Sequence, residues 1–279
     1  MESSTHISRP SMGLLQLDEG NKRYELTRHA PAEALSPFVK HYWMVSWDLT
    51  GLESYPQHVV PNPCVNLVVE RGNTFFFGPS GRKFSYLIRG KGQVFGVKFR
   101  PGGFYPFVRL PVSSLCEQPL DVSRVLDVSA ASLEEQLLTD GNDADKVSYM
   151  DQLLCAYLPA EDTQARLVHD IVQQIELNRE LLRVDDLSSF WNIHTRKLQR
   201  LFNQYVGIGP KTVIKLYRLQ NAAELIDRGL HCDLVKLSQE LGYHDQPHFI
   251  KDFKSIIGST PEEYIHSRKN LPPNIRTGV

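Results

Sequence analysis

The sequence predicts an α+β protein, with a mainly antiparallel β part and following helices, and then an all-α part that contains two helix-turn-helix units. Three observations carry this prediction. Between residues 38 and 100, short aromatic and β-branched runs alternate with Pro and Gly, which is typical of a β-sandwich or small barrel. Beyond residue 100, apolar residues recur at helical spacing. Between residues 187 and 261 one pattern occurs twice, which indicates one supersecondary unit built twice.

Length and composition allow two domains. The chain has 279 residues, of which 41% are hydrophobic and 23% charged, so each half can bury a core of its own. We expect a flexible lead over 1–22, a β-rich domain with a helical end over 23–160, a tandem helix-turn-helix domain over 161–269 and a tail over 270–279.

Charge and hydropathy restrict the partners. The net charge of -1 gives no overall field that favours nucleic acid or a membrane surface. No apolar run reaches the roughly 18 residues of a membrane span, and the first residues do not resemble a secretion signal. We therefore expect a cytoplasmic protein with no membrane partner.

The β-rich part is expected to contain strands over 41–49, 64–70, 74–77, 84–89 and 93–100. In the last of these, Phe95, Val97 and Phe99 fall on one face. Two glycine clusters, 78–83 and 90–96, lack the spacing of phosphate-binding loops and are expected to be hairpin turns.

The aromatic side chains of these strands also predict a small-molecule site, because such sites are apolar concavities with few polar groups. Its candidate residues are Trp43, Phe95 and Arg100, with Arg100 as the contact for a carboxylate or phosphate. The alternative is an ordinary aromatic core with a surface arginine.

Sequence motifs for catalysis are absent, since the chain has no HExxH, no GxSxG and no CxxC. We therefore expect no enzyme, no catalytic residue, no metal and no cofactor. The alternative is an enzyme in the β-rich part with the helical part as a targeting module. The cysteines stand far apart and are expected to be reduced and mostly buried: Cys64, Cys116, Cys155 and Cys232.

Leucines at three- and four-residue steps predict a helical hairpin over 133–158. Its apolar stripe serves either the core or a dimer interface, so a homodimer is one expected partner. Asp162 or Thr163 then begins the next helix, which ends near Asn178.

The repeat predicts two similar pairs of helices. Leu187 falls opposite Leu237 at an offset of 50, and Gly207 falls opposite Gly258 at an offset of 51. In each pair a short helix and a tight turn precede a second helix, over 195–205 and over 245–257. A further helix over 211–228 connects the pairs. The expected caps and turns are Asp185 and Asn192 in the first pair, and Asp233 and Gly242 in the second.

The second helix of a helix-turn-helix enters the major groove of DNA. In the first unit the polar residues left beside the apolar stripe predict DNA contacts at Arg196, Lys197, Gln199, Arg200 and Asn203. Arg reads guanine and Gln reads adenine, each with two hydrogen bonds. Residues 187–223 include six Lys or Arg and no Asp or Glu, which favours DNA over an ordinary solvated face.

The stretch 191–210 and especially the stretch LGYHDQPHFIKDFKSIIGSTPEEY over 241–264 resemble the tandem helix-turn-helix domain of AraC/XylS-type transcription regulators. The residues around Trp43, over 61–63 and over 99–103 are similar to the sensor-like N-terminal domain that often accompanies it. The resemblance implies a seven-helix DNA-binding domain whose second-unit contacts are Gln246, His248 and Lys251.

The resemblance also implies a function. It describes a transcription regulator, expected to be an activator, in which a cupin-like small barrel or sandwich binds a small-molecule effector and forms a dimer. The partners it implies are double-stranded promoter DNA and RNA polymerase. A third hypothesis is a DNA-alkyl acceptor that uses Cys64 or Cys116, a chemistry that sometimes accompanies this domain.

The sequence departs from the family pattern in the second unit. Pro247, Ile250 and Asp252 make its second helix poorer in hydrogen-bond donors, and Asp252 would repel phosphate if it faced the DNA. We therefore expect the first unit to contribute more base readout and the second unit more positioning, with Lys215 as a candidate phosphate contact.

Overall fold

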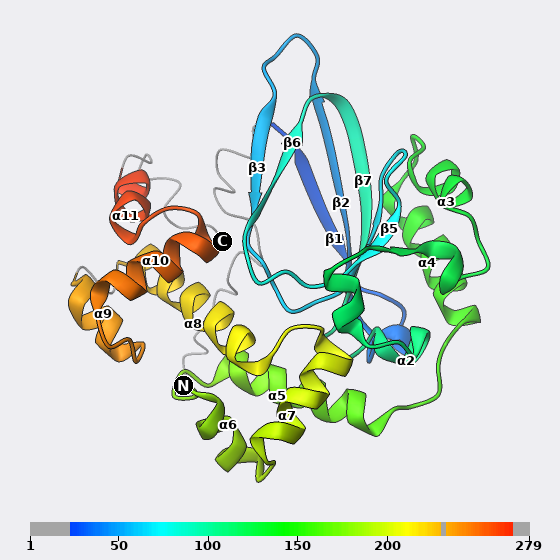
Figure 1. Ribbon diagram of the computed structural model, residues 1–279. Helices are drawn as coiled ribbons and strands as arrows, with labels where there is room; N and C mark the ends of the chain where they lie inside the picture. The colour runs from blue at the N-terminus through cyan, green and yellow to red at the C-terminus, as the bar shows by residue number, and fades with distance from the viewer. Residues whose placement is uncertain (1–22, 230–232, 270–279) are drawn as a thin grey trace, which may run out of the picture.

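The computed structural model describes residues 23–229 and 233–269. An antiparallel sheet with flanking helices forms its N-terminal part, and a helical region forms its C-terminal part (Figure 1). This confirms the α+β prediction. The lead over 1–22 and the tail over 270–279 that the sequence predicts lie outside the described residues.

Six strands form one sheet in the order β1-β2-β7-β4-β5-β8, and two strands form a separate ribbon, β3-β6. All the pairings are antiparallel. The strands are β1 (Glu25–His29), β2 (Val39–Leu49), β3 (Tyr55–Val59), β4 (Asn66–Val69), β5 (Phe75–Phe77), β6 (Phe84–Ile88), β7 (Gly90–Phe99) and β8 (Leu120–Asp121).

Each expected run contains a strand, but the sequence did not predict β1, β3 or β8. Strand β3 includes Pro56. In a sequence, a proline argues against a strand, because it has no N–H group to donate to a neighbouring strand. Here β3 pairs only with β6 among the described strands, so Pro56 costs no bond to a second neighbour.

The two glycine clusters are not hairpin turns, so that prediction was wrong. The cluster 90–96 lies within strand β7, where Gly92 and Gly96 lie against the indole rings of Trp47 and Trp43. Any larger side chain at either glycine would overlap an indole. The cluster 78–83 connects β5 to β6, which belong to different sheets.

The main core lies between one face of the large sheet and the helices that follow it. Phe95, Val97 and Phe99 all point into this core, as their alternation predicts, and Leu133 and Met150 cover them. Two helices, α3 (Ala130–Leu137) and α4 (Asp143–Ala156), occupy the expected stretch, and their apolar residues serve the core. The short helical segment η1 (Glu33–Leu35) connects β1 to β2. Three others lie between β7 and α3: α2 (Tyr105–Val108), η2 (Val112–Cys116) and η3 (Val122–Arg124).

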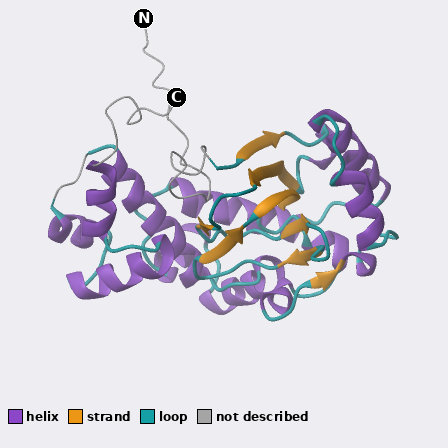
Figure 2. Ribbon diagram, turned by 90° about the horizontal axis from the view of Figure 1, so that it is seen from above, coloured by secondary structure: helices purple, strands orange, loops and turns teal. Residues whose placement is uncertain are grey.

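The C-terminal region is all helical. Its elements are α5 (Thr163–Leu177), α6 (Val184–Trp191), α7 (Thr195–Leu201), η4 (Phe202–Val206), α8 (Pro210–Asp227), α9 (Leu234–Glu240), α10 (Gln246–Ile257) and α11 (Pro261–Lys269). Viewed from above, the helices α9 and α10 and the pair α3 and α4 lie on opposite sides of the strands (Figure 2). No helix in the described part of the chain is long and apolar enough to cross a membrane.

Local sequence explains most helix limits. Asp162 Oδ1 accepts the backbone N–H groups of Gln164 and Ala165 and so caps α5 as expected. Asn192 and Gly242 make the turns with φ of 49° and 69°. The expectation that Asp185 caps α6 was wrong. Instead, the Asp186 side chain accepts the Arg183 N–H at 2.8 Å and so satisfies a backbone donor at the start of that helix.

The second helix of the first unit changes its winding before it ends. It is α-helical as far as Leu201 and then makes a π-helical turn, η4. The Gly207 N–H donates to the Phe202 carbonyl at 2.7 Å, the five-residue spacing of a π-turn. Glycines then end the second helix of both units, with φ of 95° at Gly207 and 107° at Gly258.

Candidate nucleic-acid interface

Helix α7 presents one polar face and one buried face. Leu198, Leu201 and Phe202 are buried in the core that α7 shares with α5, α6 and α8. The candidate contacts on the opposite side are all exposed: Arg196, Lys197, Gln199, Arg200 and Asn203. Within the described chain, no ion pair occupies Arg196, Lys197 or Arg200. These cations are therefore available to a partner.

Helix α10 is the matching element of the second unit. Asp245 caps it by accepting the His248 N–H at 2.8 Å, while Phe249 and Phe253 bury its inner face. His248 and Lys251 are exposed, and Gln246 is half-buried. This helix thus offers fewer free donors than α7.

Asp252 does not face solvent as a free carboxylate. Its side chain is 15% exposed and lies 3.2 Å from Lys215 Nζ and 3.5 Å from His248 Nε2. The Tyr243 hydroxyl donates to it at 3.2 Å. The repulsion of phosphate that the sequence suggested is therefore weakened, because Asp252 is balanced by neighbours that join α10 to α8.

The assignment of Lys215 to a phosphate contact is not supported by this geometry, because its ammonium group is paired with Asp252. Arg218, one turn further along α8, stacks its guanidinium 4.2 Å from the centre of the Tyr243 ring. Burial raises the pKa of Tyr243 to about 12, so its hydroxyl stays protonated. The six Lys and Arg residues over 187–223, which we call the basic window, therefore fall into two groups. The cations of α7 and Lys211 face solvent, whereas Lys215 and Arg218 contact the second unit.

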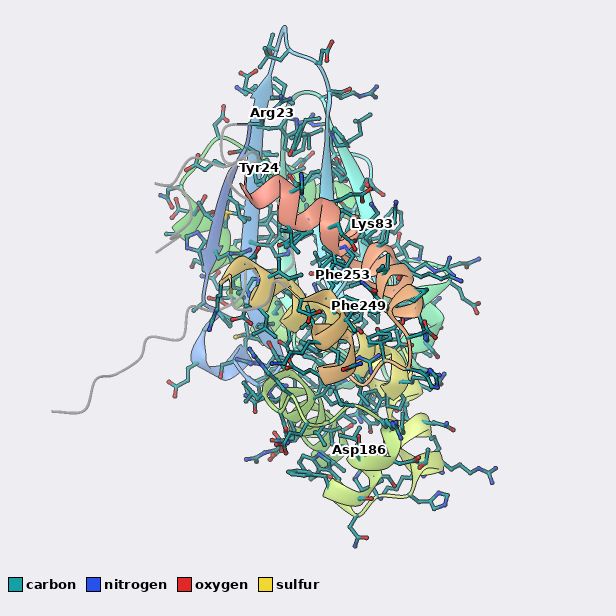
Figure 3. All side chains as sticks on the ribbon, turned by 90° about the vertical axis from the view of Figure 1, so that its left-hand side faces the viewer. Arg23, Tyr24, Lys83, Asp186, Phe249 and Phe253 are labelled. Carbon is teal, nitrogen blue, oxygen red and sulfur yellow. The ribbon has the colours of Figure 1, made fainter. Side chains whose placement is uncertain are left out.

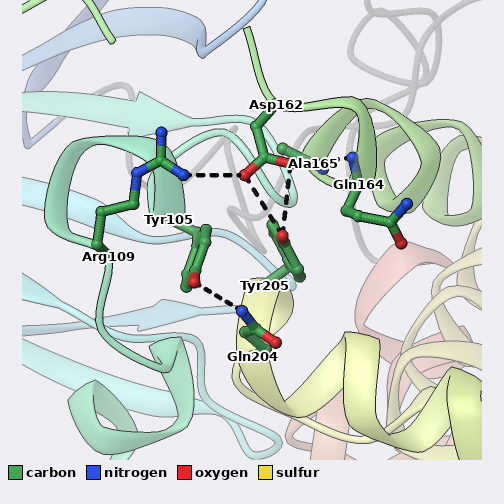
Figure 4. A network of polar contacts seen from close by, with 7 residues as sticks. All are labelled: Tyr105, Arg109, Asp162, Gln164, Ala165, Gln204 and Tyr205. Carbon is green, nitrogen blue, oxygen red and sulfur yellow. Dashed lines mark hydrogen bonds and ion pairs between the residues drawn. The ribbon is translucent and has the colours of Figure 1, made fainter. Parts of the chain in front are cut away.

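A polar network joins the end of the first unit to the β-rich half (Figure 4). The Gln204 side chain donates to the Tyr105 hydroxyl at 2.6 Å, and the Tyr205 hydroxyl donates to Asp162 at 3.3 Å. Arg109 pairs with the same carboxylate at 3.5 Å. Burial, with Asp162 close by, raises the pKa of Tyr205 to about 12. This network was not predicted, because its members come from segments that no sequence motif links.

One candidate DNA contact belongs to the same junction. The Ser113 hydroxyl donates to Asn203 Oδ1 at 3.2 Å. Asn203 is exposed and lies in the π-helical turn η4 that follows α7, so the polar surface beyond the end of α7 lies directly beside η2. The β-rich half therefore borders the candidate DNA surface.

The candidate ligand residues do not converge, which corrects that prediction. Trp43 pairs with Gly96 and Phe95 pairs with Met44 across β2 and β7. Successive strand residues point to opposite faces, so Phe95 enters the main core while Trp43 packs on the other face. Arg100 Nε donates to the Ser36 carbonyl at 2.7 Å.

A different hollow lies at the edge of the sheet. It has a volume of about 1050 Å³, and neither Trp43, Phe95 nor Arg100 lines it. Its lining is mixed in charge and includes Arg23, Glu25, Trp47, Glu70, Arg71 and Lys91.

Two of the three described cysteines are exposed, so the expectation of mostly buried thiols was wrong. Cys64 is buried, whereas Cys116 and Cys155 are exposed. Burial raises the pKa of Cys64, and partial desolvation of the Cys116 thiol, with Glu117 nearby, raises the pKa of Cys116. Because the thiolate is the nucleophile, this weakens the alkyl-acceptor hypothesis. In the described ranges, no group of three His, Cys, Asp or Glu side chains is arranged to hold a metal ion.

Comparison with known families gives a match for each half. A model described as a helix-turn-helix domain matches residues 187–267, the span of the two units. The chain carries an AraC/XylS-type helix-turn-helix domain. A model described as a domain of unknown function (DUF6597) matches residues 27–121, which include strands β2 to β8 and part of β1.

The curated relatives of this chain are named as regulators. It is 35% identical over 99 residues to the F1 operon positive regulatory protein of Yersinia pestis, which covers 35% of this chain and 33% of the relative. It is 30% identical over 108 residues to the RCS-specific HTH-type transcriptional activator RclR of Escherichia coli, 39% of this chain and 38% of the relative. An uncharacterized HTH-type transcriptional regulator of Haemophilus influenzae is 22% identical over 165 residues, 54% of this chain and 53% of its own length. The chain thus matches between a third and about half of the length of these relatives.

Among solved structures, ToxT from Vibrio cholerae O395 is similar with a TM-score of 0.37 and 11% identity, over 90% of this chain and 100% of that protein.

Proposed function

We propose that the protein is a sequence-specific transcription regulator that binds double-stranded promoter DNA through α7 and α10. The observation that carries this proposal is the face of α7, where Arg196, Gln199 and Arg200 are exposed without an acidic partner among the described residues. These side chains have the donor chemistry that reads base edges in the major groove.

The family resemblance supports a division of labour between the halves. The β-rich domain over 23–160 serves as sensor and dimerisation domain, and residues 161–269 bind DNA. The hollow at the sheet edge is the place for a small-molecule effector, and its charged lining suits a polar compound. Regulation by an effector requires that it bind two states of the protein with different affinity.

Activation is the expected sign of regulation, because the Yersinia pestis relative is named a positive regulatory protein and RclR an activator. An activator in the cytoplasm would act with RNA polymerase, which we propose as a partner together with a second copy of the chain.

The test is selection of bound sequences from random double-stranded DNA with the full chain. We expect enrichment of a site with two half-sites whose centres are about 10 base pairs apart, because two recognition helices enter successive major grooves. Gel shifts with the selected site and with a scrambled site of equal length should then differ by about a thousandfold or more in Kd at physiological salt. Recovery of DNA without any shared sequence would contradict the proposal.

A further inference from the structure

A single short loop of the β-rich half touches both helix-turn-helix units. This loop, residues 78–83, connects β5 to β6. Its start is pressed against η2, since a Cβ added to Gly78 would lie 2.6 Å from the Leu115 carbonyl carbon. The loop cannot shift there without moving η2, so its position is fixed by the β-rich half.

The first contact is to the end of the first unit. Gly207 lies against the loop so closely that an added Cβ would come within 3.1 Å of Pro79 Cγ and 3.0 Å of Val112 Cγ1. The Cys116 thiol donates to the Gly207 carbonyl at 3.4 Å. Gly207 is the residue that ends the recognition helix α7 with its π-turn.

The second contact is to the end of the second unit. Lys83 Nζ donates to the Gly258 carbonyl at 3.2 Å, and the Lys83 backbone N–H donates to the Ser255 carbonyl at 3.4 Å. Figure 3 shows Lys83 beside the end of α10 that carries Phe253. Between the two contacts, Gly81 lies against Thr212 at the start of α8, where an added Cβ would be 3.2 Å from Thr212 Cγ2.

The two contacts use equivalent positions of the repeat. Gly207 and Gly258 correspond at the offset of 51, and each ends the helix of its unit that faces DNA. Residues 79, 81 and 83 therefore touch the first unit, the connecting helix and the second unit in turn.

We propose that the loop over 78–83 is a specificity-determining element that fixes the placement of α7 relative to α10 and thereby selects the spacing of the two half-sites. This rests on the proposed function. Pro79, Gly81 and Lys83 would act through the helices that they touch, so they are positioning residues.

The need for such an element follows from the packing. The two units bury separate apolar clusters, one around Phe202 and one around Phe253, and α8 contributes to both. Besides α8, the two units touch where Gly242 lies against Leu182, since an added Cβ would be 3.0 Å from Leu182 Cδ1. These links alone leave the tilt between the two cores open to small bending motions. On DNA, one inserted base pair turns the second half-site by roughly 34° about the axis. A further connection through the loop over 78–83 makes such a turn costly for the protein to follow.

The test compares Lys83→Ala with Arg82→Ala and Lys83→Arg in the full chain. Arg82 is exposed in the same loop, so Arg82→Ala removes an equal charge without the contact to Gly258. Lys83→Arg keeps a donor that can reach the same carbonyl. Neither of the two positions is buried, so all three variants should fold.

Amide exchange without DNA is the first measurement. Because one hydrogen bond between the halves is lost, exchange over residues 254–258 should accelerate by about 3- to 10-fold in Lys83→Ala, while β2 and β7 remain protected. Arg82→Ala and Lys83→Arg should match the unaltered chain. Equal exchange in Lys83→Ala and Arg82→Ala would overturn the proposal.

Binding to selected DNA is the second measurement. The ratio of affinities for the selected site and for a site with one extra base pair between the half-sites should fall by about 3- to 10-fold in Lys83→Ala, and Lys83→Arg should restore it. An unchanged ratio would overturn the role in spacing. If the unaltered chain selected no sequence at all, the proposed function would fail, while the exchange comparison would still decide whether the loop holds the second unit.

Discussion

The two helix-turn-helix units share a backbone plan but differ in what their second helices offer. Helix α7 exposes Arg196 and Arg200 with no acidic neighbour among the described residues, whereas α10 carries Asp252, which pairs with Lys215 and lies near His248. One copy therefore keeps its cations for a partner, and the other uses charge to attach itself to α8. The difference shows how a repeated unit can be divided between reading and anchoring.

The units also differ in how the β-rich half holds them. The first is fixed by the network around Asp162 and by the Ser113 to Asn203 hydrogen bond. The second is reached by the backbone and side chain of Lys83. Val60 of the β-rich half is also buried in the core of the second unit, so each unit is attached by different segments of that half.

The largest expected effect tests whether the units are equal as structures. Phe202 and Phe253 occupy equivalent positions, and both are fully buried. Phe202→Ala and Phe253→Ala should each lower the free energy of unfolding by about 3–5 kcal/mol, because each leaves a large cavity. Urea denaturation followed by far-UV circular dichroism measures this. A loss below about 1 kcal/mol at either position would show that one unit is loosely packed, contrary to the structure.

A smaller effect tests the division of the basic window. Lys215→Ala should lower the free energy of unfolding by roughly 1 kcal/mol, because it leaves the mostly buried Asp252 carboxylate without its closest cation. Lys211→Ala is the matched control, since Lys211 is an exposed lysine near the start of the same helix, and its stability should be unchanged.

The same pair of variants also separates anchoring from phosphate contact. If Lys215→Ala left stability intact and weakened binding to every DNA sequence alike, Lys215 would be a phosphate contact after all, and the contrast between the units would be reduced.

Much of the fold was predictable because its signals are local. The turns at Asn192 and Gly242 need a left-handed backbone, and Asp162 and Asp233 have the side chains that cap helices. The alternation of Phe95, Val97 and Phe99 set the inner face of β7. Each of these follows from a few neighbouring residues.

What the sequence did not predict depends on contacts between distant segments. Trp43 and Phe95 looked alike as pocket residues, and only the register of β2 and β7 places them on opposite faces. Lys215 was expected to be free for a phosphate contact, but in the fold α10 places Asp252 beside it. The loop over 78–83 was expected to be a hairpin turn, because nothing in its own sequence indicates that helices from the other half pack against its glycines.

The most direct test of the central claim compares Arg200→Ala with Lys251→Ala on the selected DNA site. If the first unit is the stronger reader, Arg200→Ala should lose about 1–3 kcal/mol of discrimination between the correct and a substituted base pair in one half-site. Lys251→Ala should weaken binding to all sequences by about the same factor, and this factor should be smaller than the loss of discrimination in Arg200→Ala. An equal or larger loss of base discrimination in Lys251→Ala would contradict the account.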